Sequence, residues 1–270
     1  MSSTTPFSSP WLDYFGQVSI IHLRERIERF NALKNELARI GVDIHDERVL
    51  IPDAPRPDDS YGFPSRSIYG NFLSHLDILR KARDENSHSV LILEDDAIFR
   101  SFFADRAYQE QIVKTLESEL WGLCYFGHPI TDQLSDQPIG LITTPLMFHW
   151  AHCYAVHQRV LSDLVAYLEA TIETSAGHPD GGKMYIDGAL SMFRSRMTGI
   201  KVLVSNPAIS IQGGSPSGIA TRSWYDRLSV LSKPLILVRA ARDELWRRTG
   251  IQNPTPKNLY KYLKLKLKFN

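Results

Sequence analysis

Apolar and polar positions recur along the chain with two different periods, and together these periods predict an α/β fold. Apolar residues spaced three or four apart predict helices at residues 27–40 and 65–86. Short apolar runs predict strands, and the unbroken run at residues 89–93 is typical of a strand covered on both faces. Because strands alternate with helices, we expect an α/β fold with an open, mostly parallel sheet flanked by helices.

The remaining segments extend the same alternation. We expect further strands near residues 18–23, 42–51, 121–126, 139–143, 149–156, 201–205 and 208–212, and further helices near 105–120, 157–173, 185–196 and 223–249. The domain organisation expected from this is a flexible, Ser/Thr/Pro-rich lead over residues 1–14, one α/β domain over 15–222, and a basic helical extension over 223–270.

The charges of the chain are distributed unevenly. Residues 233–270 carry ten Lys and Arg against two acids, a net charge of +8, so the other 232 residues must sum to −7 to give the total of +1. An acidic main body argues against nucleic-acid binding. The last stretch, residues 257–270, holds five lysines interleaved with Leu, which is consistent with a solubilising tail or with a surface that binds anionic membrane.

Cysteine content and hydropathy bear on the cellular compartment. Cys124 and Cys153 are too few for a disulfide framework and favour a reducing compartment. No run of about 18 apolar residues predicts a membrane-spanning helix, and the first residues lack the pattern of a secretory signal. We expect a cytoplasmic protein. If the basic tail binds membrane, it would place the protein at the inner face.

Three adjacent acids, Glu94, Asp95 and Asp96, follow the buried strand at residues 89–93. In an extended strand Glu94 and Asp96 point to one side and Asp95 to the other. Carboxylates this close repel one another in a partly desolvated crevice, so a proton or a cation must neutralise them. Oxygen ligands suit a hard divalent ion such as Mg²⁺ or Mn²⁺. The alternative is an acidic turn that caps the next helix.

Two motifs at a matching separation resemble glycosyltransferase family 25, which contains bacterial lipopolysaccharide glycosyltransferases and procollagen galactosyltransferases. The stretch YGNFLSHL at residues 69–76 is similar to the family's Ser-His helix, and LILEDDA at residues 91–97 is similar to its LEDD strand end. IIHLRERIER at residues 20–29 resembles the first strand and helix, with His22 in place of the usual Asn. YIDGAL at residues 185–190 resembles a later segment, and the similarity spans about residues 17–215.

The resemblance implies a GT-A fold and an inverting, metal-dependent hexosyltransferase that uses a nucleotide-diphosphate sugar, with UDP-hexose favoured. It implies Mn²⁺ or Mg²⁺ as cofactor, and transfer of galactose or glucose to a glycan or lipid-linked glycan acceptor in lipopolysaccharide or other surface polysaccharide synthesis. The residues that it implies are His22, Arg24, Ser74, His75 and Asp95 for binding the donor, and Glu94 and Asp96 for binding the metal.

Asp187 is the candidate general base, because an inverting transfer needs one carboxylate to take the proton of the acceptor hydroxyl. Its alternative role is an acid that stabilises the start of the helix at residues 185–196. His75 falls on the apolar stripe of its own helix, which is also typical of a hydrogen-bonded core histidine. Two other function classes stay open, an inactive relative that binds nucleotide sugar or glycan, and a metal-dependent phosphotransfer or receiver-type domain.

Overall fold

The apolar run at residues 89–93 forms the third strand of a seven-stranded sheet. The structure, a computed structural model, describes residues 9–213. The strand order is β2-β1-β3-β7-β5-β8-β6, and β7 and β6 run antiparallel to their neighbours while the other strands are parallel. The strands are β1 (Val18–Ile21), β2 (Val49–Leu50), β3 (Ser89–Glu94), β5 (Trp121–Tyr125), β6 (Gly140–Thr143), β7 (Cys153–His157) and β8 (Lys201–Asn206).

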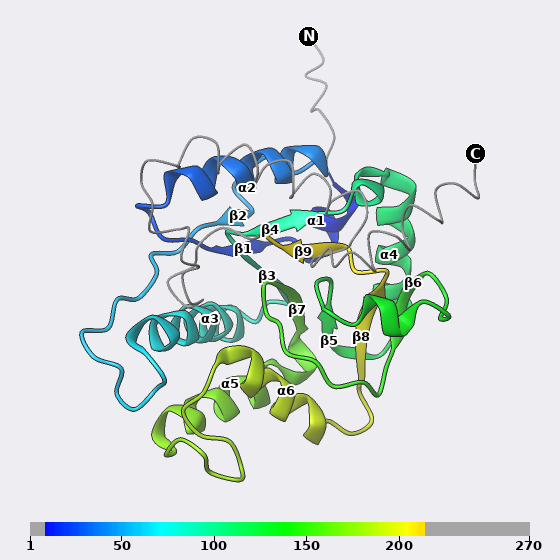
Figure 1. Ribbon diagram of the computed structural model, residues 1–270. Helices are drawn as coiled ribbons and strands as arrows, with labels where there is room; N and C mark the ends of the chain where they lie inside the picture. The colour runs from blue at the N-terminus through cyan, green and yellow to red at the C-terminus, as the bar shows by residue number, and fades with distance from the viewer. Residues whose placement is uncertain (1–8, 214–270) are drawn as a thin grey trace, which may run out of the picture.

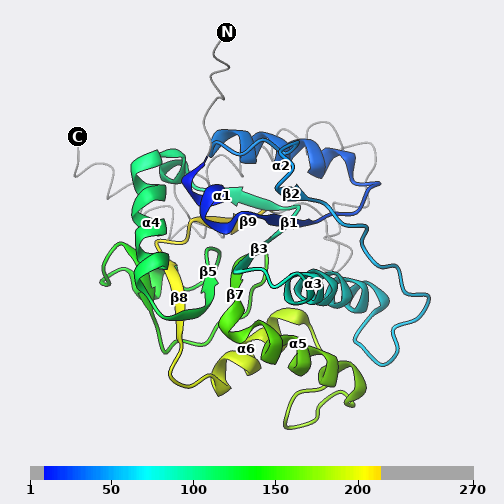
Figure 2. The same ribbon diagram turned by 180° about the vertical axis from the view of Figure 1, so that it is seen from behind.

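Helices cover both faces of this sheet (Figure 1). One core cluster joins the sheet to α3 (Arg66–Asp84), α5 (Gln158–Glu173) and α6 (Ile186–Arg196). A second cluster joins its other face to α1 (Pro10–Phe15), α2 (Ile27–Arg39) and α4 (Arg106–Ser118), as the view from behind also shows (Figure 2). The predicted α/β class and the helix-flanked, mostly parallel sheet are therefore confirmed.

Local capping sets where several helices begin. The hydroxyl of Ser65 accepts a hydrogen bond from the Ile68 amide at the start of α3, and the Asp105 carboxylate accepts one from Ala107 at the start of α4. The His157 ring does the same for α5. Each cap satisfies a backbone donor that has no partner within the helix.

Some expected elements differ in the structure. The loose lead over residues 1–14 is wrong for residues 10–14, because they belong to α1, whose Trp11 is buried among Phe99, Phe103 and Phe126. The strand expected over 42–51 shortens to β2, since the Asp43 and Asp46 side chains turn the preceding backbone. The helix expected over 223–249, like the basic extension over 223–270, lies outside the described residues.

A small second sheet was not predicted. It pairs β4 (Ala97–Phe99) with β9 (Ser210–Gln212) in antiparallel register, with Ala97 opposite Gln212. This pairing brings the end of the described chain back beside residues 94–96. Two 3₁₀ turns, Ser101–Ala104 and Thr131–Leu134, complete the described elements. Within residues 9–213, none of the helices has the length and apolar character needed to cross a membrane.

Candidate active site

A cavity of about 730 Å³ opens at the edge of the sheet where β1 and β3 end. Ile21 at the end of β1 lies opposite Glu94 at the end of β3, so the residues that follow both strands meet at this edge. The start of α2, residues 54–57, the first turns of α3 and the start of α6 form the other walls. Both its volume and its place at strand carboxyl ends are typical of small-molecule sites.

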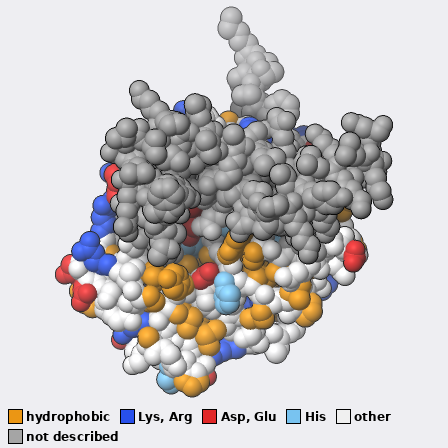
Figure 3. All heavy atoms as spheres, in the orientation of Figure 1, with side chains coloured by type: hydrophobic (Ala, Val, Ile, Leu, Met, Phe, Trp, Pro, Cys, Tyr) orange, Lys and Arg blue, Asp and Glu red, His pale blue; other side chains and the backbone are white. Residues whose placement is uncertain are grey.

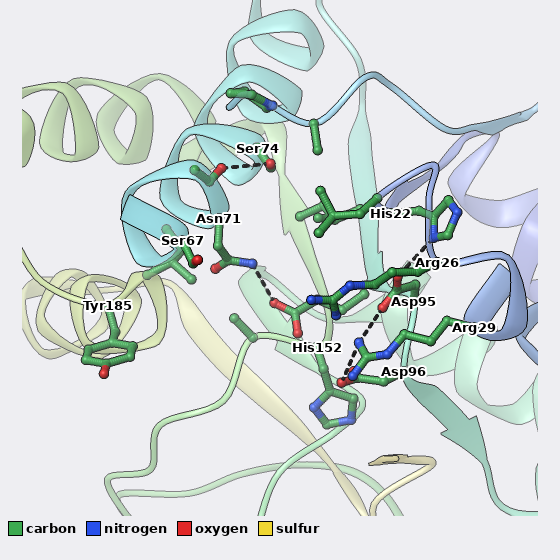
Figure 4. Close-up of a pocket in the computed structure, with 18 of the residues that line it drawn as sticks. His22, Arg26, Arg29, Ser67, Asn71, Ser74, Asp95, Asp96, His152 and Tyr185 are labelled. Carbon is green, nitrogen blue, oxygen red and sulfur yellow. Dashed lines mark hydrogen bonds and ion pairs between the residues drawn. The ribbon is translucent and has the colours of Figure 1, made fainter. Parts of the chain in front are cut away.

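The acidic turn, residues 94–96, lies in one wall of this cavity. Arg29 Nη1 donates to Asp95 Oδ1 at 2.7 Å and to Asp96 Oδ2 at 3.3 Å, and His22 Nδ1 lies 2.9 Å from Asp95 Oδ2 (Figure 4). The expectation that Asp95 points away from Asp96 is wrong, because β3 ends at Glu94 and the next two residues form a turn. One guanidinium therefore partly neutralises two carboxylates.

Glu94 turns instead toward α3. Its Oε1 accepts a hydrogen bond from Asn71 Nδ2 at 3.2 Å and lies 3.3 Å from His75 Nε2. Burial by itself raises the pKa of Glu94, but the hydrogen bonds from His75 and Asn71 outweigh burial and hold this pKa below its usual value. Glu94 is thus an ionised carboxylate at the cavity wall.

Asp96 has the opposite electrostatic character. Burial, and then the nearby charge of Glu94, raise the pKa of Asp96 to about 7 against the opposing effect of Arg29. Its Oδ1 is buried and has no hydrogen-bond partner among the described residues, and Gln212 Nε2 reaches its Oδ2 only at 3.5 Å. Asp96 therefore has an unsatisfied oxygen that a proton or a cation would satisfy.

The arrangement of these acids determines which kind of divalent-cation site they can form. Within residues 9–213 no group of three or more His, Cys, Asp or Glu side chains is arranged to hold a metal ion. The unsatisfied oxygen of Asp96 and the ionised Glu94 offer two carboxylates in the cavity. That set fits an ion such as Mg²⁺ that takes its other ligands from phosphates and water, and does not fit an all-protein cage.

Arginines line the cavity beside the acidic turn. Arg26 points into it and makes no ion pair within the described part of the chain (Figure 4). Arg56 pairs with Glu25, and Arg66 also lines the wall. Guanidinium groups bind phosphates through charge-assisted hydrogen bonds, so this side of the cavity suits an anionic ligand.

Asp187 lines the same cavity from the first turn of α6. Its Oδ1 accepts a hydrogen bond from the Gly188 amide at 2.8 Å. Burial raises the pKa of this carboxyl despite that hydrogen bond. A carboxylate in a cavity with a raised pKa is a candidate proton acceptor.

The structure separates the predicted site residues into two groups. Those that line the cavity are His22, Ser74, Glu94, Asp95, Asp96 and Asp187. Ser74 is buried and its hydroxyl donates to the Gly70 carbonyl within the helix at 2.9 Å. His75 is fully buried behind Glu94, out of the cavity wall, and Arg24 forms an exposed ion pair with Asp53 outside the cavity. Neither His75 nor Arg24 lines the cavity, and their binding of the donor stays a prediction.

Arg26, Arg29 and Asn71 belong to the site but were not predicted from the sequence. Arg26 and Arg29 are three residues apart at the start of α2, so they share a helix face that points to the cavity. Asn71 lies one turn before His75 on α3, and both bond to Glu94. The spacing of these residues along their helices shows which of them share a face. It does not show that the face meets the acidic turn, because the acids lie at least 19 residues away in sequence.

Comparison with known proteins gives only remote likeness. No family model and no curated protein matches this sequence. The chain is similar in structure to a glycosyltransferase involved in the glycosylation of the major capsid of PBCV-1, with 12% identity, a TM-score of 0.45, and coverage of 84% of this chain and 97% of that one. It is also similar to mannose-1-phosphate geranyltransferase from Thermus thermophilus, with 13% identity, a TM-score of 0.36, and coverage of 70% and 73%.

Proposed function

We propose that the chain is an inverting glycosyltransferase of the family 25 type, with a GT-A fold, that moves a hexose from a nucleotide-diphosphate sugar to a hydroxyl of a glycan. UDP-galactose and UDP-glucose are the favoured donors. The observation that carries the proposal is one cavity with the acidic turn, a group of arginines and Asp187 on its walls. The resemblance of residues 69–76 and 91–97 to the family's motifs supports it.

The donor end of the cavity is assigned to the side that carries Arg26 and the acidic turn. Arg26 would bind a donor phosphate, because it is directed into the cavity and makes no ion pair with an acid in residues 9–213. Glu94 and Asp96 would hold a Mn²⁺ or Mg²⁺ ion, which, when bound, neutralises charge that develops on the leaving diphosphate. His22 and Arg29 keep Asp95 in place beside them.

The chemical step is assigned to Asp187. It would take the proton of the acceptor hydroxyl while the hydroxyl oxygen bonds to the anomeric carbon. The bond from that carbon to the diphosphate oxygen breaks on the opposite face, which inverts the configuration and releases the nucleoside diphosphate. The raised pKa of Asp187 brings its basicity closer to neutral pH, where a general base works best.

The acceptor end is assigned to the α6 side. Tyr185, which is 45% exposed, and Trp150 line the cavity, and Tyr185 lies away from Arg26 and Arg29 (Figure 4). Apolar side chains are also visible over the lower half of the molecule, where α5 and α6 lie (Figure 1 and Figure 3). Aromatic rings offer rigid contact area with a polar edge, which suits a sugar ring of a lipid-linked glycan. Such an acceptor agrees with a cytoplasmic enzyme of surface polysaccharide synthesis held at the inner membrane face.

Ligand-dependent stability tests the proposal directly. Thermal unfolding would be followed with UDP-glucose, UDP-galactose and GDP-mannose, each with and without Mn²⁺. A donor at one hundred times its Kd should add about 2.7 kcal/mol to the free energy of unfolding. Asp96→Ala should abolish the Mn²⁺-dependent part of the stabilisation and the transfer of hexose. Asp180→Ala, at an exposed position, should keep both. Stabilisation by none of these sugars, or full transfer by Asp96→Ala in excess chelator, contradicts the proposal.

One observation favours a second candidate, an inactive module that binds nucleotide sugar without metal. Arg29 already bonds to both Asp95 and Asp96 and so supplies positive charge where a cation is expected. For this candidate, donor affinity is equal with Mn²⁺ and with chelator, and no nucleoside diphosphate is released with any glycan acceptor. A Mn²⁺-dependent affinity with steady release supports the transferase instead.

A further inference from the structure

Three side chains form a hydrogen-bonded chain that runs from the core to the cavity wall. The Tyr154 hydroxyl on β7 lies 3.0 Å from His75 Nδ1 on α3, and His75 Nε2 lies 3.3 Å from Glu94 Oε1. Tyr154 and His75 are fully buried, and their rings stack with centroids 5.7 Å apart. Glu94 is the only one of the three that lines the cavity, with its side chain 19% exposed.

The donors and acceptors in this chain fix the position of one proton. An ionised carboxylate only accepts hydrogen bonds, so the 3.3 Å contact with Glu94 requires a proton on His75 Nε2. With Nε2 as the donor to Glu94, Nδ1 is the atom that can accept the hydrogen bond of the Tyr154 hydroxyl. With the proton on Nδ1 alone, Nε2 and the Glu94 carboxylate would both be acceptors, and no hydrogen bond could join them. The Nε2–H tautomer satisfies every buried polar atom of the chain.

The same arrangement fixes the direction of Glu94. Asn71 Nδ2 donates to the same oxygen, Oε1, at 3.2 Å, so both protein donors converge on one atom. The second carboxylate oxygen is left for a ligand in the cavity. We infer that Tyr154 and His75 are positioning residues, which act through the His75 Nε2–H to hold Glu94 in the orientation that binds the donor or its cation. This inference rests on the proposed function.

Packing alone does not account for these residue types. A buried hydroxyl and a buried imidazole each cost free energy unless they are hydrogen-bonded. Phe fits the space of Tyr154 without that cost, and the neighbouring core is aromatic, with Tyr125 stacked 6.1 Å from Tyr154. The polar groups of Tyr154 and His75 contact each other and lead to Glu94. A carboxylate such as Glu94 keeps one orientation when partners of this kind hold it by hydrogen bonds.

Tyr154→Phe is the central variant, because it removes the hydroxyl and keeps the ring. Tyr125→Phe is its matched control, because Tyr125 is equally buried on the adjacent strand and its hydroxyl makes no hydrogen bond within the described residues. Nitrogen NMR of ¹⁵N-histidine protein reports which ring nitrogen carries the proton, and the spectrum of His75→Gln assigns the His75 signals. We expect the Nε2–H tautomer in all three proteins, wild type, Tyr125→Phe and Tyr154→Phe. The Nδ1 signal should shift only in Tyr154→Phe, because that nitrogen then loses the hydroxyl that donates to it.

Turnover of UDP-glucose or UDP-galactose, measured as release of UDP, supplies the second readout. We expect Tyr154→Phe to lower it by about tenfold, the low end of the loss usual when a partner of a metal or substrate ligand is removed. Tyr125→Phe should keep it within about twofold. His75→Gln, whose amide NH₂ group can still donate toward Glu94, should retain more turnover than His75→Leu when both variants are compared at equal folded fraction by circular dichroism.

The two readouts separate the failure of this inference from the failure of the proposed function. An Nδ1–H tautomer of His75 in wild type overturns the inference, as does equal turnover by Tyr154→Phe and Tyr125→Phe. A wild-type chain that releases no UDP from either sugar contradicts the proposed function. In that case UDP affinity with Mn²⁺, compared between Tyr154→Phe and Tyr125→Phe, decides the positioning role, and equal affinities overturn it.

Discussion

At the scale of single residues, three carboxyl groups in one cavity have pKa values shifted in different directions. Hydrogen bonds lower the pKa of Glu94, whereas burial raises the pKa of Asp96 to about 7 and also raises that of Asp187. Groups whose environments separate their pKa values are suited to different roles in one reaction. Glu94 keeps its charge for binding, and Asp187 is the group adapted to accept a proton.

The role of Asp187 leads to the first prediction. Asp187→Asn keeps the shape and the helix N-terminal position but removes the base, so turnover should fall by about 10²-fold or more while UDP affinity stays within about twofold. Calorimetry with UDP and steady-state kinetics measure the two effects. Asp180→Asn, an exposed acid in the preceding loop, is the control and should change neither. Weakened UDP binding with normal turnover would make Asp187 a donor contact instead.

His152 gives a prediction for stability against pH. Its ring is fully buried against Gly127, where an added Cβ would lie 2.2 Å from it, and burial lowers the pKa of His152 to about 4. The unfolded chain therefore binds more protons than the folded chain between about pH 6.5 and pH 4, so stability falls as pH falls through that window. From pH 7 to pH 5 this group should cost about 2 kcal/mol.

Urea unfolding of wild type and His152→Gln at pH 7 and pH 5 measures that cost. The variant cannot take up the proton, so its loss of stability between the two pH values should be smaller by about 2 kcal/mol. The quantity compared is the change in the free energy of unfolding between pH 7 and pH 5. A packing defect in the variant lowers this free energy at both pH values and so cancels in the change. Equal losses in the two proteins would show that another group causes the acid sensitivity.

Six of the eight predicted site residues line the cavity, but the contacts among them were not predicted. Glu94, Asp95, Asp96 and Asp187 were identified because acids after a buried strand or before a helix are visible locally. The bond from Arg29 to Asp95 joins residues 66 apart, and no local pattern encodes it. His75 lay on an apolar stripe, which agrees with its burial, although the resemblance implied that it binds the donor.

At the scale of elements, α3 is fitted closely against the loop that closes the cavity. A Cβ at Gly70 would lie 2.9 Å from the Pro55 carbonyl oxygen and 3.3 Å from the Pro57 ring. Residues 54–57 line the cavity beside Gly70. This glycine therefore permits close approach of the loop, which outweighs the cost of about 1 kcal/mol that glycine brings to a helix interior.

Gly70→Ala should therefore move the loop while it strengthens the helix. We expect UDP affinity to fall by about threefold to tenfold, with the free energy of unfolding changed by less than about 1 kcal/mol because the helix gain offsets the strain. Gly70→Ser should weaken binding at least as much. Calorimetry and urea unfolding measure both quantities. Unchanged UDP affinity in both variants would mean that the loop does not contact the nucleotide.

Element prediction from sequence succeeded where periodicity was strong and failed where it was short. The helices α2, α3, α4, α5 and α6 match their predicted segments to within a few residues, because each carries several turns of apolar stripe. The six-residue α1 and three-residue β4 are too short to show a period. The pairing of β4 with β9 joins residues more than 110 apart, which local patterns do not contain.

At the scale of the whole molecule, strand order decides which residues meet. β7 lies between β3 and β5 and runs antiparallel to both, so the residue before it, His152, comes beside Glu94 rather than at the far edge. Sequence analysis predicted the strands and the mostly parallel sheet but not this inserted strand, because a strand's partners depend on long-range packing. The cavity arises from that order and not from one motif.

The distribution of charge over the chain gives the last prediction. Residues 233–270 carry a net +8 and the other 232 residues −7. Five lysines from residue 257 onward, at about 1 kcal/mol each, would supply roughly 5 kcal/mol near an anionic membrane before ordering costs. Leu265 and Phe269 would add apolar contact at the headgroup boundary. An acidic body would be repelled by the same surface, so attachment should be through the tail.

Sedimentation with lipid vesicles, either neutral or rich in anionic lipid, tests this for the full chain and for a chain that ends at Gln252. The full chain should sediment with anionic vesicles only, and the shorter chain with neither. Because salt at about 0.15 M limits the reach of charge to about 8 Å, binding should weaken steadily as salt rises. Transfer to a soluble glycan should be equal for both chains, since the cavity lies within residues 9–213. Equal sedimentation of the two chains on anionic vesicles would leave the tail a solubilising segment.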